Sequence, residues 1–253
     1  MAHSAAGVGD IVGSREHAVL MFHGVDEGDS YYGSIPTRRF REIIEFVTES
    51  ASVVPLSEIN DRRTGRQVAI TFDDGLKSFY SEAFPVLEEY DVPATVFVCP
   101  AFINDRNRET VLSRFGLEGE ERIMMTDDEI AELIESPLIT VGNHTRSHRK
   151  LTNVEHEEEL RSEIVESKLS LEDRYDIAID SFSYPYGAYD QESRQLVEDH
   201  HDRSVTTDPF LIGREGPHRM PRISAHKPQR MLEWELSPLG DRLNRYRHRI
   251  ANS

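Results

Sequence analysis

The stretch that most constrains this fold is Val-Ala-Ile-Thr-Phe-Asp-Asp-Gly, residues 68–75. Residues 68–72 form an apolar run of β-prone side chains, which predicts a strand buried inside a sheet. Because unpaired charge is costly there, Asp73 and Asp74 are expected to emerge where the strand ends, and Gly75 to turn the chain. The adjacent carboxylates repel each other, so a metal ion, another cation or hydrogen bonds must compensate them. A plain solvated turn is the alternative, since Asp-Gly is a common turn pair.

Short strand-like runs alternate with helix-like segments along the chain. The predicted strands are residues 18–22, 52–56, 68–72, 94–98, 138–141, 181–184, 203–207 and 219–224. The predicted helices follow N-caps at Thr37, Thr126 and Asn153, and others cover residues 79–87, 192–199 and the tail from Gln229. This alternation predicts an α/β fold with a parallel sheet, wound open or closed into a barrel. We expect one domain, residues 17–253 with a C-terminal helical tail, after a lead-in of residues 1–16.

Residues 101–125 are charged and irregular. A connection of this length is unusual in a compact domain, so we expect a lid or an insertion. Directly after it, Thr126 and Glu129 have the spacing of a capping box, which predicts the start of the next helix.

Polar side chains follow several predicted strands at the point where each one ends. They are His23, Asp73, Asp74, His144, His148 and Tyr186. In parallel α/β proteins function collects at the carboxyl ends of the strands, so we expect these side chains on one rim. Two histidines and one carboxylate make an open three-ligand site for zinc or a similar divalent ion. A histidine pair alone is more often incidental, and its combination with the Asp-Asp pair favours a metal.

Composition limits the classes of partner. The 253 residues carry a net charge of −17 and only four lysines, an acidic pattern that resembles proteins from halophilic cytoplasm. It argues against nucleic acid and anionic membranes as partners. The single cysteine, Cys99, excludes an internal disulfide and a cysteine-based metal site. We see no signal segment and no run long enough to span a bilayer, so we expect a cytoplasmic protein, of undetermined oligomeric state.

Three motifs in order resemble a known family. They are Thr-Phe-Asp-Asp-Gly at residues 71–75, His-Thr-Arg-Ser-His at residues 144–148 and Pro-Tyr-Gly at residues 185–187. The chain is similar to the polysaccharide deacetylases, or NodB-homology domains, of carbohydrate esterase family 4, over roughly residues 17–225. The resemblance implies a distorted (β/α) barrel with about seven parallel strands, a TIM-like barrel. It also implies a divalent metal ion and removal of N- or O-acetyl groups from sugars.

The resemblance also assigns roles by position. Asp73 matches the catalytic base of the family, and Asp74, His144 and His148 match its metal ligands. The metal and the backbone N–H of the residue matching Tyr186 would stabilise the oxyanion.

Two departures resemble a rearranged subgroup that includes the poly-N-acetylglucosamine deacetylases. Many members have an arginine that pairs with the base where this chain has Ser183, and the C-terminal Leu-x-His that supplies the general acid is absent. In the subgroup an N-terminal strand ending in His-Gly fills the acid position, which predicts His23 as the acid, with His226 as its rival. Arg222 is the candidate for the missing arginine.

Three functions remain open at this point. The first is a metal-dependent deacetylase acting on an N-acetylated sugar or polysaccharide. The second is an allantoinase-like hydrolase of a small cyclic amide on the same fold, and the third is a non-catalytic carbohydrate-binding relative. The complete set of Asp73, Asp74, His144 and His148 weighs against the third, because a binding module has no use for a poised metal-bound water.

Overall fold

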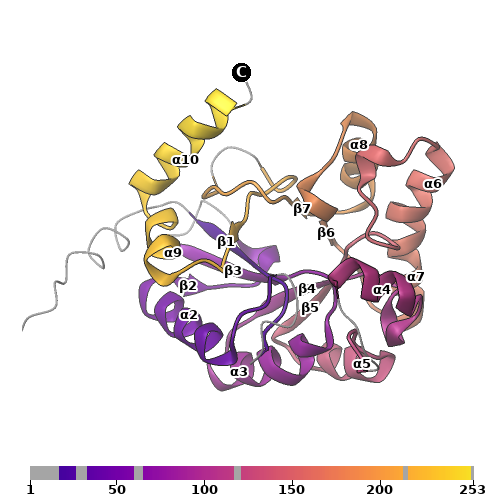
Figure 1. Cartoon of the computed structure of the whole chain (residues 1–253), viewed down its shortest axis with the longest axis horizontal. Coiled ribbons are helices and arrows are strands. Elements are labelled where there is room, and N and C mark those ends of the chain that lie inside the picture. The colour runs from indigo at the N-terminus through magenta and orange to yellow at the C-terminus, as the bar shows by residue number, and fades with distance from the viewer. Residues whose placement is uncertain (1–16, 27–32, 60–64, 117–120, 213–215, 252–253) are drawn as a thin grey trace, which may run out of the picture.

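The computed structural model describes residues 17–26, 33–59, 65–116, 121–212 and 216–251 (Figure 1). Its parallel strands follow the order β7-β6-β5-β4-β3-β1-β8, and a short β2 pairs with β3. Their bounds are β1 Ala18–Phe22, β2 Ser52–Val53, β3 Gln67–Phe72, β4 Ala94–Val98, β5 Ile139–Asn143, β6 Ser181–Ser183, β7 Arg203–Val205 and β8 Ile223–Ser224. The predicted α/β fold, a distorted barrel with about seven parallel strands, is confirmed.

The segment leading into β8 connects the two edges of the curled sheet. Met220 pairs with Val205 of β7, whereas Ile223 and Ser224 pair with β1 on the other edge. The chain therefore changes partner between residues 220 and 223, which shortens the predicted strand 219–224 to two residues. Arg222 lies at this change of partner and is fully buried.

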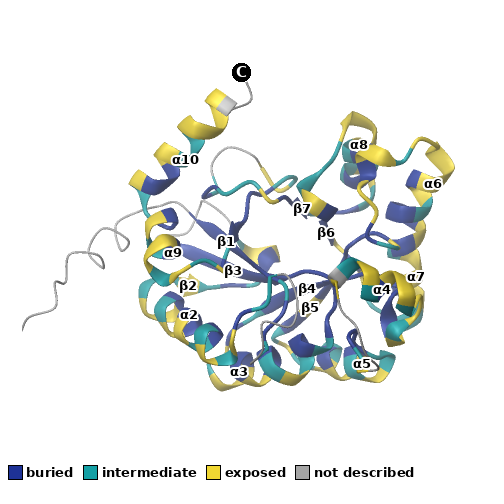
Figure 2. Cartoon of the chain, viewed as in Figure 1, coloured by how far each residue is buried: buried dark blue, intermediate teal, exposed yellow. Residues whose placement is uncertain are grey.

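Helices lie around the outside of the curled sheet, and α10 extends away from it (Figure 1). Their bounds are α2 Thr37–Ser50, α3 Phe84–Glu89, α4 Arg108–Phe115, α5 Asp127–Glu135, α6 Glu157–Arg161, α7 Ser167–Tyr175, α8 Gln191–His200, α9 Gln229–Glu235 and α10 Pro238–Ala251. Single π turns precede α3 and α7. Most helices bury one side and expose the other, while β1, β3, β4 and β6 are buried along their whole length (Figure 2). No helix in the described ranges is long and apolar enough to cross a membrane.

An aromatic cluster fixes β1 and β3 against α2 and the turn that precedes α3. The Phe72 ring lies 5.1 Å from Phe22 and 4.7 Å from Phe79, and Phe22 lies 5.2 Å from Phe40. All four side chains are buried. Truncation of such a phenylalanine to alanine costs about 3–5 kcal/mol, so this cluster holds the strand that ends at Asp73 firmly in place.

The helix starts were only partly predictable. The capping box is confirmed, because Thr126 Oγ1 accepts from the Glu129 N–H at 3.2 Å and the Glu129 carboxylate accepts from the Thr126 N–H at 2.8 Å. Thr37 is wrong as an N-cap: it is the first residue of α2, after Pro36. Asn153 is also wrong, because buried Leu151 draws residues 151–153 into a 3₁₀ turn and α6 begins at Glu157. The predicted lead-in, residues 1–16, lies outside the described residues.

Candidate active site

The polar residues that end the strands meet on one rim of the sheet. Since β1, β3, β5 and β6 are parallel, their carboxyl ends point the same way. The rim encloses a cavity of about 410 Å³. Its lining includes His23, Asp73, Asp74, His144, His148, Tyr186 and His226. Of the predicted site residues only Arg222 does not line the cavity, and it lies directly behind Asp73.

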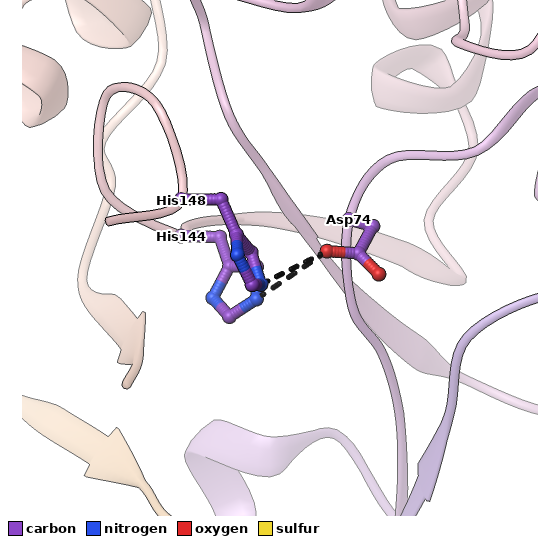
Figure 3. A group of neighbouring side chains, drawn as sticks. All are labelled: Asp74, His144 and His148. Atoms are coloured by element: carbon purple, nitrogen blue, oxygen red, sulfur yellow. Dashed lines mark ion pairs between the residues drawn. The ribbon is translucent and has the colours of Figure 1, made fainter. Parts of the chain in front are cut away.

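Three buried side chains form a compact ligand set (Figure 3). Asp74 Oδ1 lies 3.7 Å from His144 Nε2 and 3.2 Å from His148 Nε2, and the three ligand atoms lie within 4.8 Å of one another. His144 Nδ1 donates to the Ser183 carbonyl at 2.8 Å, which leaves the lone pair of Nε2 facing Asp74. This donor set suits zinc or a similar divalent ion with an open coordination position.

The loops that follow β3, β5 and β6 at this rim contain residues with backbone conformations that only glycine adopts readily. Asp74, Thr145, His148 and Tyr186 have φ values of 75°, 62°, 55° and 60°, in the left-handed region. For a β-branched residue such as Thr145 this conformation is a genuine outlier. Residues held in such conformations concentrate at functional sites, where the surrounding structure compensates for the strain.

Asp73 and Arg222 form a buried, bidentate ion pair next to the ligand set. Arg222 Nη1 and Nη2 each donate to one Asp73 oxygen at 2.7 Å. The guanidinium also donates to the Thr206 carbonyl at 2.8 Å and to Ser183 Oγ at 2.9 Å. Burial alone would raise the pKa of Asp73, but the charge of Arg222, with a smaller contribution from His144, holds this pKa well below its usual range. The carboxylate therefore stays ionised at neutral pH.

This pair involves the residue predicted to replace the family arginine. Ser183 stands where the resemblance expects that arginine, and its hydroxyl accepts a hydrogen bond from Arg222, the predicted substitute. Ser183 and Arg222 are 39 positions apart in the sequence. They are in contact because β6 and the segment 220–224 both border the interior of the curled sheet.

Both histidines considered for the acid line the cavity. His23 is half-buried, and its Nδ1 is buried without a hydrogen-bond partner in the described ranges. Gly33 packs so closely that a Cβ there would lie 3.2 Å from this nitrogen. His226 is exposed, its Nδ1 contacts Ser224 Oγ, and partial burial together with nearby His23 lowers its pKa. The structure thus brings both rings to the cavity and packs His23 more tightly.

Arg114 is a site residue that the sequence did not single out. The predicted lid or insertion, residues 101–125, contains α4, and Arg114 near the end of this helix lines the cavity. Its guanidinium donates to Tyr186 Oη at 2.6 Å and to His148 Nδ1. The Tyr186 ring meets the His148 ring edge-on at 5.0 Å. Only the prediction of a lid pointed to this segment, which contains several other arginines.

The contact with Arg114 fixes the hydrogen on His148. A guanidinium can only donate, so Nδ1 accepts here and the ring hydrogen lies on Nε2, which faces Asp74. Burial lowers the pKa of His148 to about 3, because it outweighs the opposing charge of Asp74, and the charge of Arg114 acts in the same direction as burial. The ring is therefore neutral, as a metal ligand must be, but its hydrogen occupies the nitrogen that would bind the ion.

A curled parallel α/β sheet defines the class of this protein as a distorted barrel, and its rim carries two histidines and a carboxylate that could hold a metal ion, beside a second, ion-paired carboxylate. Within that class the assignment is specific: the chain belongs to the polysaccharide deacetylase family, whose sequence profile matches residues 60–204.

Individual relatives agree with the family. YxkH of Bacillus subtilis (strain 168) is 24% identical over 205 residues, which cover 78% of this chain and 66% of that protein. The poly-beta-1,6-N-acetyl-D-glucosamine N-deacetylase of Escherichia coli (strain K12) is 26% identical over 136 residues, 50% of this chain and 20% of that protein. The chain thus spans less than two thirds of either relative. The structure of IcaB from Ammonifex degensii shares the fold, with a TM-score of 0.68 at 19% identity over 89% of this chain and 97% of IcaB.

Proposed function

We propose that this protein is a metal-dependent deacetylase that removes acetyl groups from an N-acetylated sugar or polysaccharide. The observation that carries the proposal is the buried ligand set of Asp74, His144 and His148, with the ionised Asp73 next to it. The named activity of the Escherichia coli relative supports an N-acetylated glycan as the substrate class. Zinc is the expected ion, because two imidazoles and one carboxylate are a common zinc donor set.

Each side chain then has a distinct task. A divalent ion bound to Asp74 and the two histidines would polarise the acetyl carbonyl and acidify a bound water. Asp73 accepts the proton of the attacking water, and Arg222 keeps its carboxylate ionised and fixed in orientation. The backbone N–H of Tyr186 donates to the oxyanion of the tetrahedral intermediate.

His23 is the proposed general acid. The amine that leaves the acetyl group needs a proton, and imidazole is the side chain whose ordinary pKa lies nearest neutrality. His23 directly follows β1, which pairs with β3, and it lines the same cavity as the base Asp73. The cavity of about 410 Å³ lies within the usual size range of small-molecule sites.

The allantoinase-like alternative keeps the same ligand set and is distinguished by its product. Metal content and acetate release from N-acetylglucosamine oligomers should be measured on the same preparation, with ring opening of a cyclic amide as the competing assay. We expect one divalent ion per chain and acetate release. Ring opening without acetate release would replace the proposed substrate class, and stoichiometric metal in the His144→Ala, His148→Ala double variant would refute the ligand assignment.

The two neighbouring aspartates provide a matched pair of variants. Asp73→Asn should retain the metal and lower the turnover rate by roughly 10²-fold or more, the usual scale for losing a general base. Asp74→Asn should lose metal affinity instead. If the metal is lost from Asp73→Asn and kept in Asp74→Asn, the two roles are assigned the wrong way round.

A further inference from the structure

The C-terminal helix α10 (Pro238–Ala251) packs on the protein with its polar side. The Asp241 carboxylate accepts from the Leu211 N–H at 2.9 Å and pairs with Arg245 at 2.9 Å. The guanidinium of Arg245 lies 4.9 Å from the Phe210 ring centre, and His248 meets the same ring at 5.2 Å. The helix face made by residues 241, 245 and 248 is therefore the docked face.

The opposite face of α10 is apolar and exposed. Leu239, Leu243, Tyr246 and Ile250 are 56%, 41%, 62% and 58% exposed. Their four-three-four spacing places them on one side of a helix, opposite the docked face. A surface helix normally buries its apolar face, whereas α10 packs against the protein with its polar face and exposes its apolar face. Figure 2 shows α10 extending away from the sheet with most of its surface exposed.

Helix α9 (Gln229–Glu235), directly before α10, carries two further exposed apolar side chains. Met231 is 51% exposed and Trp234 is 43% exposed, immediately before α10. Apart from these six side chains on α9 and α10, only Leu169 and Tyr186 are large, apolar and exposed in the described ranges. We call the six residues the C-terminal stripe. An apolar surface concentrated in this way marks an interaction site.

The charge of α10 opposes that of the rest of the chain. The helix contains four arginines and one aspartate, whereas the whole chain has a net charge of −17. By helical spacing, Arg242 and Arg249 flank one side of the stripe and Arg247 flanks the other. The argument from net charge against anionic membranes therefore does not apply to this end of the molecule, since interactions at a surface depend on local charge.

We propose that the C-terminal stripe docks on an anionic lipid surface. Its features are those of helices that lie in a membrane interface: apolar and aromatic residues on one side, arginines at its edges and low overall hydrophobicity. With 14 residues and four arginines, α10 lies on a bilayer rather than crossing it. Trp234 and Tyr246 are the residue types that favour the headgroup region. Pairing of two copies along the stripe is disfavoured, because arginines would face arginines in either orientation.

Trp234 gives a direct readout, because it is the only tryptophan of the chain. The full chain should be mixed with vesicles of phosphatidylcholine containing phosphatidylglycerol, and separately with vesicles of phosphatidylcholine alone. We expect a blue shift of tryptophan emission, protection from acrylamide quenching and flotation with the anionic vesicles, all weakened by added salt. Equal binding to both vesicle types, or no binding to either, overturns the proposal.

Matched variants test which residues act. Leu243→Glu with Ile250→Glu should abolish vesicle binding, whereas Leu169→Glu, at a site on α7 that is 54% exposed, should leave it unchanged. Exchange of Arg242, Arg247 and Arg249 for glutamine should weaken binding by on the order of 100-fold, since each interfacial arginine contributes roughly fivefold. Circular dichroism and acetate release verify that each variant is folded.

The competing occupants have their own signatures. If light scattering shows a dimer whose Trp234 emission is already blue-shifted without vesicles and whose assembly is lost in the Leu243→Glu, Ile250→Glu variant, the stripe is an interface between copies and the proposal is wrong. Displacement of the protein from anionic vesicles by an acidic amphipathic peptide at equimolar concentration would likewise assign the stripe to a protein partner.

Discussion

Replacing Arg222 by methionine tests the buried pair at the centre of the site. The substitution removes the cation and leaves the Asp73 carboxylate 3% exposed and unpaired, next to acceptors at Thr206 and Ser183. Breaking a buried pair on one side costs about 3–5 kcal/mol. For a chain of 253 residues this corresponds to a fall in Tm of roughly 6–20 °C. Urea and thermal unfolding measure it directly.

The pH dependence separates the lost charge from lost packing. In the wild type the pKa of Asp73 is lowered, so its stabilisation is fully present above the unfolded pKa of about 3.9 and is lost as pH falls through the folded value. In Arg222→Met nothing compensates the burial of Asp73, so burial raises the folded pKa of this carboxyl group. The carboxylate therefore destabilises the variant increasingly as the pH rises above the unfolded pKa of about 3.9. The difference in unfolding free energy should therefore be largest near neutral pH and shrink as the pH falls toward about 4.

Two controls make the result decisive. Arg222→Lys keeps the charge without the bidentate geometry and should lose less stability than Arg222→Met. Arg38→Met, which removes the exposed pair with Glu42, should change stability by no more than about 0.5 kcal/mol. A loss below about 1 kcal/mol in Arg222→Met, or a loss independent of pH, would refute the inference that Arg222 compensates a buried charge.

Three further predictions concern the cavity. His23→Ala should keep the metal and remove the basic limb of the pH–rate profile, whereas His226→Ala changes little; near-normal turnover in His23→Ala excludes it as the acid. Arg114→Leu should tighten zinc binding in a chelator competition. Without Arg114, the ring hydrogen of His148 can move from Nε2 to Nδ1, which leaves Nε2 free to bind the ion. An unchanged zinc affinity would contradict this mechanism. Gly187→Ala should lose roughly 2–4 kcal/mol in urea unfolding, because φ is 65° and the new Cβ would lie 2.9 Å from Thr207 N; wild-type stability would show that the loop can adjust.

The sequence by itself determined the strands and the polar residues directly after them. Residues 68–72 are β-prone and apolar apart from Thr71, so the two carboxylates and the glycine that follow are predicted to lie beyond the buried part of the strand. The same logic placed His23, His144 and Tyr186 on one rim, because parallel strands align their carboxyl ends. These inferences need only the local sequence pattern of each strand and the general rule that parallel strands align their carboxyl ends.

The helix starts show where local patterns stop being sufficient. Thr126 and Glu129 bond to each other across three residues, so their spacing predicts the structure. Asn153 has the residue type of an N-cap, but the burial of neighbouring Leu151 decides the local conformation. Packing against residues distant in the sequence competes with the local preference of a residue for an N-cap position. The sequence alone does not reveal which of the two contributes more to the free energy of folding.

Only the tertiary structure decided how charges and surfaces meet. The pairing of Asp73 with Arg222 spans 149 positions, and it arises because the segment 220–224 connects the two edges of the sheet. Arg114 reaches His148 only because α4 folds over the rim. The periodicity of α10 reveals a stripe but not whether it faces the protein or solvent, since an amphipathic helix can dock by either face. That choice rests on the polar contacts of residues 241, 245 and 248 with a loop about 30 residues earlier in the chain.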